Sequence, residues 1–138
     1  MNPVMQLLKI KNGVLEYTAV MFWCPGCEYL YKDDPDPAGG LHMLPVDGDT
    51  PFPKWTFNGN LEKPTLSPSI LSSHDFARRP GPDGEIVEQK FVCHSFLVDG
   101  VFQFLGDCTH QYANQFVPIP PLPDWVVEEK KMEGYNEH

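Results

Sequence analysis

The predicted fold is organised around the stretch Phe91-Val-Cys-His-Ser-Phe-Leu-Val-Asp-Gly-Val-Phe-Gln-Phe-Leu-Gly-Asp-Cys-Thr-His110. Two runs rich in aromatic and β-branched residues flank Asp99-Gly100, and this dipeptide in such a setting is the strongest short-range signal for a two-residue hairpin turn. The sequence therefore predicts a β-hairpin in which Val98 pairs with Val101. Counting outward gives the remaining pairs: Leu97 with Phe102, Ser95 with Phe104, Cys93 with Gly106 and Phe91 with Cys108.

Side chains alternate between the two faces of such a hairpin. One face carries an apolar set with two thiols: Phe91, Cys93, Ser95, Leu97, Phe102, Phe104, Cys108 and, if the strand continues, His110. The other face carries a more polar set: Val92, His94, Phe96, Val101, Gln103, Leu105 and Asp107. Cys93 and Cys108 are diagonal neighbours on the first face, and His94 and Asp107 are diagonal neighbours on the second. A slip of one residue would exchange the faces, so both pairs depend on this register.

A second thiol pair, Cys24-Pro-Gly-Cys27, lies far upstream. Its tight turn directs both sulfurs at one ion, and zinc prefers four such ligands in a tetrahedron. The first residues contain no hydrophobic block typical of a secretory signal, so we expect a cytoplasmic protein in which cysteines serve metal or redox chemistry before disulfides. We expect a Zn2+ site whose ligands are Cys24, Cys27, Cys93 and Cys108, with His42 or His110 as alternative ligands in a mixed site.

The second face of the hairpin also carries residues that catalysis requires. His94 and Asp107 would form the oriented imidazole that a general base needs, and His110 would complete an open zinc position in a zinc-dependent hydrolase. The alternative is a structural role, in which His94 and Asp107 orient the metal ligands or hydrogen-bond to each other in the core.

Two other motifs weigh less. Trp23-Cys-Pro-Gly-Cys27 is similar to the Trp-Cys-x-x-Cys of thiol oxidoreductases, but the residues that follow cannot form the long helix that lowers the thiol pKa there. The hydroxyls in Lys63-Pro-Thr-Leu-Ser-Pro-Ser69 lie outside any nucleophile-elbow motif, so no serine nucleophile is predicted.

Composition favours a small β protein. The chain has 138 residues, and its 15 prolines and 11 glycines favour short strands joined by turns over long helices. We expect a mainly β fold, a single small domain of short antiparallel strands and hairpins with a zinc knuckle and little helix, over residues 1–127, and a polar tail at 128–138. The net charge of −9 argues against a nucleic-acid partner, because phosphate binding needs a basic surface. No stretch approaches the ~20 apolar residues of a membrane span.

Turn signals divide the rest of the chain. They predict four further segments: strands at Met5–Ile10, Val14–Trp23, Leu41–Val46 and Trp55–Phe57. Lys63–Ser73 carries two prolines, which favours an edge strand or a shaped loop over a central strand. His74–Gln89 is predicted to be an exposed loop.

Several motifs resemble a family of small proteins, mostly from phages and prophages, without an established activity. They are Phe22-Trp-Cys-Pro-Gly-Cys27, Leu41-His42, Trp55-x-Phe-Asn-Gly59, Pro64-Thr-Leu-Ser-Pro-Ser-Ile70, Cys93-His-Ser-Phe96, and Gly106-Asp-Cys-Thr-His110 with Gln115. The resemblance implies a zinc-binding β-rich domain and no catalytic assignment. Such proteins are sometimes labelled ammonia monooxygenase, which does not fit a chain without a membrane span, and relatives are associated with bacterial ubiquitin-like and defence gene clusters. Asn114 replaces the glycine of the usual Leu-Ala-Gly-Gln, and asparagine tolerates a left-handed backbone.

Three functions follow in order of preference. The first is a phage-type zinc-binding accessory or interaction protein that binds a host or phage protein in the host cytoplasm and acts on that protein or on a defence system. The second is the zinc-dependent hydrolase that uses His94, Asp107 and His110. The third is a thiol redox protein.

Overall fold

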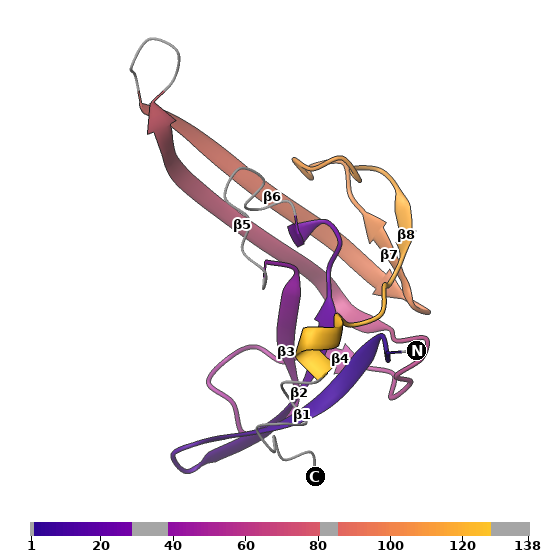
Figure 1. The fold of residues 1–138 in the computed structure, drawn as a ribbon. Helices are drawn as coiled ribbons and strands as arrows, with labels where there is room; N and C mark the ends of the chain where they lie inside the picture. Colours follow the sequence, from indigo (N-terminus) through magenta and orange to yellow (C-terminus); the bar gives the residue numbers. More distant parts are fainter. Residues whose placement is uncertain (1, 29–38, 81–85, 128–138) are drawn as a thin grey trace.

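The computed structural model describes residues 2–28, 39–80 and 86–127, and within them it contains two antiparallel sheets (Figure 1). The first sheet has the order β1-β2-β3, with β1 at Met5–Asn12, β2 at Leu15–Trp23 and β3 at Leu41–Gly48. The second has the order β4-β5-β6-β7-β8, with strands at Thr56–Phe57, Leu66–Pro80, Ile86–Val98, Val101–Phe104 and Phe116–Pro118. The expected mainly β fold is confirmed, and the described residues include a single helical turn at residues 124–127.

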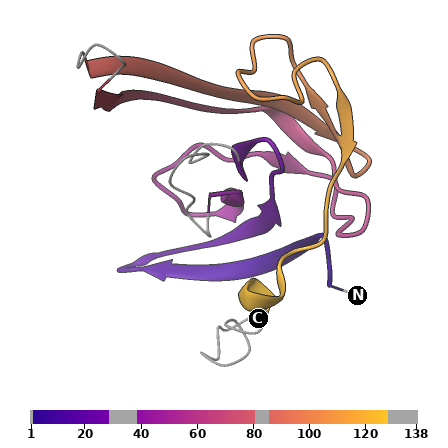
Figure 2. The same ribbon diagram turned by 45° about the horizontal axis from the view of Figure 1, so that its top comes forward.

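The two sheets lie as two layers, with the turn that follows β2 between them (Figure 2). Their facing sides supply one apolar core that joins both layers: Met5, Val20 and Phe22 from the first sheet, and Leu66, Ile70, Leu97, Phe102 and Phe104 from the second. Phe102 is fully buried, and its ring lies 5.5 Å from that of Phe104. Truncating such a side chain to alanine costs about 3–5 kcal/mol, so this core is the main source of stability.

The β6–β7 hairpin forms in the predicted register from its turn to Phe104, where β7 ends, so the predicted pairs of Cys93 with Gly106 and of Phe91 with Cys108 do not form. Leu97 pairs with Phe102 and Ser95 with Phe104. Asp99 and Gly100 both have positive φ, at 49° and 77°, as a type I′ turn requires. The predicted inner face is confirmed, because all of its residues in 91–108 are buried: Phe91, Cys93, Ser95, Leu97, Phe102, Phe104 and Cys108.

The prediction of an exposed loop at His74–Gln89 is wrong. β5 continues to Pro80 and β6 begins at Ile86, and the two strands pair from Ile70 onward in one long hairpin. Backbone hydrogen bonds alone can extend a hairpin beyond the core, so these residues need no apolar alternation that the sequence would reveal. The predicted polar tail at 128–138 lies outside the described residues.

A bulge interrupts β5 near its start. Leu66 pairs with Leu97 and Ile70 with Ser95, so residues 67–69 of β5 together oppose the single residue Phe96 of β6. Such irregularities redirect side chains and occur often beside active sites. Here the bulge determines where Ser69 lies on the sheet.

None of the helical segments in the described part of the chain has the length and apolar character needed to cross a membrane.

Candidate functional site

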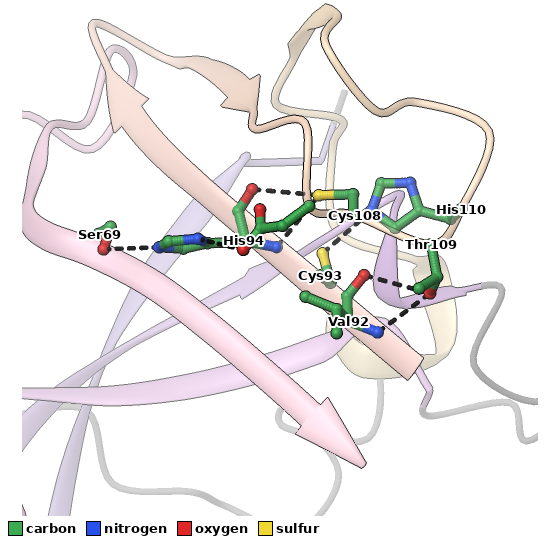
Figure 3. A network of polar contacts seen from close by, with 8 residues as sticks. Ser69, Val92, Cys93, His94, Cys108, Thr109 and His110 are labelled. Atoms are coloured by element: carbon green, nitrogen blue, oxygen red, sulfur yellow. Dashed lines mark hydrogen bonds and ion pairs between the residues drawn. The ribbon is translucent and has the colours of Figure 1, made fainter. Parts of the chain in front are cut away.

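A serine, a histidine and an aspartate meet on the outer face of the second sheet. Nε2 of His94 lies 3.0 Å from Oγ of Ser69, and Nδ1 of His94 lies 3.0 Å from Oδ2 of Asp107. Figure 3 shows Ser69 on β5 and His94 on β6, with a dashed line for the hydrogen bond between their side chains. A carboxylate only accepts hydrogen bonds, so Nδ1 carries the ring proton and Nε2 accepts from the serine hydroxyl. This is the order of contacts in a Ser-His-Asp triad.

The strand geometry places each member of the triad. Cys93 and Ser95 are buried on the inner face, so His94 between them points outward. Ser69 reaches His94 through the β5 bulge. Asp107 lies in the turn after β7, and this turn is joined to β6 by the Leu105 amide, which donates to the His94 carbonyl at 2.9 Å.

Cys108 and Thr109 clamp this turn to β6 (Figure 3). Sγ of Cys108 accepts from the His94 amide and donates to the His94 carbonyl, both at 3.2 Å. Burial raises the pKa of Cys108, which keeps the thiol protonated as a donor. Thr109 binds Val92 in the same way: its hydroxyl accepts from the Val92 amide at 3.0 Å, and its own amide donates to the Val92 carbonyl at 2.9 Å. Together these contacts fix the backbone of β6 at His94 and at Val92, two residues before it.

The other three cysteines gather on the inner face with two histidines. Sγ of Cys24 lies 3.7 Å from Sγ of Cys93. Nε2 of His42 lies 3.1 Å from Sγ of Cys27, and Nε2 of His110 lies 3.3 Å from Sγ of Cys93. The donor atoms of Cys24, Cys27 and His42 all lie within 4.8 Å of one another and could hold a metal ion.

The tight turn at Cys24–Cys27 holds its two thiols close to His42 and His110. Its first amide donates to the Gly40 carbonyl at 2.7 Å, which ties the turn to the start of β3 and so to His42. A Cβ atom at Gly26 would lie 2.4 Å from Nε2 of His110. Glycine is therefore required here, because only its missing side chain lets the His110 ring approach the thiols.

The pKa values of the three thiols favour a bound cation. Hydrogen bonds from Cys27 and then Cys93 lower the pKa of Cys24 well below that of a free thiol. The interaction with Cys24 raises the pKa values of both Cys27 and Cys93. Three thiols this close cannot all ionise unless a positive charge joins them. Burial lowers the pKa of His110, which favours the neutral imidazole that binds metals.

The predicted residues thus fall into two sites on opposite faces of β6. His94 and Asp107 meet as predicted, and they meet a serine on the outer face. Cys24, Cys27 and Cys93 gather with His42 and His110 on the inner face, while the thiol of Cys108 contacts the His94 backbone. The four cysteines are free of disulfides and buried, which leaves the thiol pair poorly accessible for redox exchange.

Sequence reasoning missed Ser69. Its hydroxyl lies in a strand bulge, and no short motif marks such a nucleophile. One signal was present: if His74–Gln89 formed a β-hairpin instead of a loop, Ser69 would lie opposite the segment that contains His94 and Phe96. The expectation of a loop at His74–Gln89 concealed that pairing.

Comparison with known proteins yields one family. No curated protein and no solved structure matches the chain. The family model described as bacterial ubiquitination-like system serine protease (BubE) matches residues 5–105. This range covers Ser69 and His94 and ends just before Asp107. The chain belongs to the BubE family, since this model covers well over half of its residues.

Proposed function

We propose that this protein is a serine protease that acts in a bacterial ubiquitination-like system, with Ser69 as the nucleophile. The observation that carries the proposal is that His94 contacts Ser69 and Asp107 at 3.0 Å through its two ring nitrogens. The family description supports the same activity. A zinc-dependent hydrolase built on His94 fits less well, since both of its nitrogens are already engaged.

The geometry supports acyl transfer in two steps. In the first, Oγ of Ser69 attacks the scissile carbonyl while Nε2 of His94 takes the hydroxyl proton. The new ester bond forms, the bond to the leaving amine breaks, and His94 gives its proton to that amine. In the second, water attacks the ester with His94 again as base, which releases the acid and restores Ser69. Asp107 holds the imidazole in the required tautomer throughout.

The triad lies on an open surface. The side chain of His94 is 24% exposed and that of Asp107 is 56% exposed. A segment of a protein substrate can therefore reach Ser69 from solvent. The expected protein partner would then be the substrate; a phage origin and a host target stay predictions.

We also propose that the inner cluster binds Zn2+ through Cys24, Cys27, Cys93 and His42, with His110 against the Cys93 sulfur. Three thiolates and one imidazole form a common closed zinc site. The bound ion would supply cross-links between the turn at Cys24–Cys27, β3 and β6. Because Cys93 and His94 are adjacent residues on opposite faces of β6, a fixed Cys93 also fixes the backbone that presents His94.

The decisive experiment compares two neighbouring serines. Hydrolysis of p-nitrophenyl acetate and of a casein digest should be lost in Ser69→Ala, because Oγ of Ser69 is the hydroxyl oxygen that contacts Nε2 of His94. Ser67→Ala is the matched control, since Ser67 lies two residues away in the same bulge and is exposed. Equal activity in Ser69→Ala and the wild type would refute the proposal. The zinc content of His42→Ala and of His110→Ala, measured by mass spectrometry, separately tests which histidine is the fourth ligand.

A further inference from the structure

Large apolar side chains are exposed on the same face as the triad. They are Leu71 at 58%, Phe96 at 41%, Val98 at 51% and Phe116 at 69%, and together they are called the apolar platform. Scattered exposed apolar residues are ordinary, but a group of them on one face beside polar functional residues is typical of a binding surface.

The strand registers place the platform around the nucleophile. Leu71 pairs directly with His94, so their side chains stand next to each other on the outer face. Phe96 lies opposite the bulge that contains Ser69. Phe96 also pairs with Gln103, and Gln103 pairs with Phe116, which continues the same row across β6, β7 and β8.

The core does not explain these apolar residues. Their inward neighbours, Ile70, Ser95 and Leu97, already fill the inner face of the sheet and are buried. Residues that alternate with core positions on a solvated face are normally polar. Within the described residues, the core therefore leaves the platform exposed for contact with a binding partner.

We propose that the platform binds an extended segment of the substrate that carries apolar side chains next to the scissile bond. This inference rests on the proposed protease function and names the class of segment that it cleaves. Leu71 on β5 pairs with His94, two residues from Phe96, so it flanks this row. From β5 to β8 the platform spans three strand spacings, about 14 Å. An extended chain rises about 3.3 Å per residue, so roughly four substrate residues fit across it. The segment is the occupant because the row begins beside Ser69 and His94, where the scissile bond must lie.

The test uses a mixture of synthetic ten-residue peptides of random sequence, with cleavage products sequenced by mass spectrometry. Leu, Ile, Val, Phe and Met should be enriched within four residues on one side of the cleaved bond. In Phe96→Ser this enrichment should fall, and kcat/KM for the peptide that the wild type cleaves fastest should drop about 10-fold, mainly through KM, as expected for one lost apolar contact.

Phe52→Ser provides the matched control. Phe52 is also an exposed phenylalanine, but it lies in the connection between β3 and β4, outside the platform. Its kcat/KM should stay within about twofold of the wild type. Equal loss in Phe96→Ser and Phe52→Ser, or cleavage without apolar preference, would overturn the platform.

Labelling of Ser69 by a fluorophosphonate separates this inference from the function on which it rests. Labelling that persists in Phe96→Ser while the apolar preference falls supports the platform. If Phe96→Ser loses both the labelling of Ser69 and the cleavage of peptides, Phe96 shapes the triad itself, and the platform is overturned. Peptide cleavage that is equally fast in Ser69→Ala would refute the proposed protease, whereas cleavage that needs Ser69 but shows no apolar preference refutes the platform alone.

Discussion

Replacing Asp107 by asparagine should slow the enzyme by a moderate factor that the structure sets. A fully buried triad aspartate is worth about 10⁴-fold in kcat. Asp107 is 56% exposed, so water can solvate the imidazolium in its place. Its contact to His94, at 3.0 Å, is then comparable to an ordinary hydrogen bond to a charged group, worth about 1.5–3 kcal/mol. At 1.36 kcal/mol per tenfold change in rate, this predicts a loss in kcat of about 10- to 150-fold.

The assay is hydrolysis of p-nitrophenyl acetate, with the rate of fluorophosphonate labelling as a second readout of nucleophile activation. Asp99→Asn is the matched control, because Asp99 is an exposed carboxylate at the hairpin turn, and asparagine tolerates its positive φ of 49°. Both rates should be unchanged in this control. A kcat for Asp107→Asn within twofold of the wild type would refute the role of Asp107 in orienting His94.

Three further results are expected. Cys93→Ser should lose bound zinc. Cys108→Ala should keep the zinc but lose about 10-fold in esterase activity, because the Cys108 thiol holds the His94 backbone and does not bind the ion. Equal zinc loss in both variants would contradict these two roles. Zinc binding to the metal-free protein near pH 7 should release about two protons, because the pKa values of Cys27 and Cys93 are raised and that of Cys24 is lowered. Calorimetry in buffers of different ionisation enthalpy counts these protons. Acid should therefore release the metal. A chelator should lower the melting temperature and esterase activity together, and zinc should restore both; activity unchanged after full metal removal would disprove the support of β6 by the ion.

The hairpin and its faces could be predicted because their determinants are local. Asp99-Gly100 fixes the turn, and the turn fixes which residues share a face. The register predicts that His94 and Asp107 lie close together, and the turn after β7 brings them into contact. Asn114 also adopts the left-handed backbone expected of it, with φ of 65°.

What the sequence did not reveal depends on contacts between distant segments. Ser69 meets His94 only because a long hairpin pairs β5 with β6 and a bulge shifts the register. Cys108 was expected to bind zinc because it shares the inner face with Cys93. Pairing of β7 with β6 ends at Phe104, however, and the following turn brings the thiol of Cys108 onto the His94 backbone. Alternation along a strand predicts faces, but it does not predict where a side chain points after the strand ends.

The most direct test of the central claim is to find which atom of this protein reacts with a serine-directed probe. The purified protein is treated with a fluorophosphonate, and its adduct is located by intact and peptide mass spectrometry. The triad predicts one adduct per chain, on Ser69, which disappears in Ser69→Ala and His94→Ala and persists in Ser67→Ala. No adduct on the folded wild type, or an adduct on a different residue that survives Ser69→Ala, would contradict it.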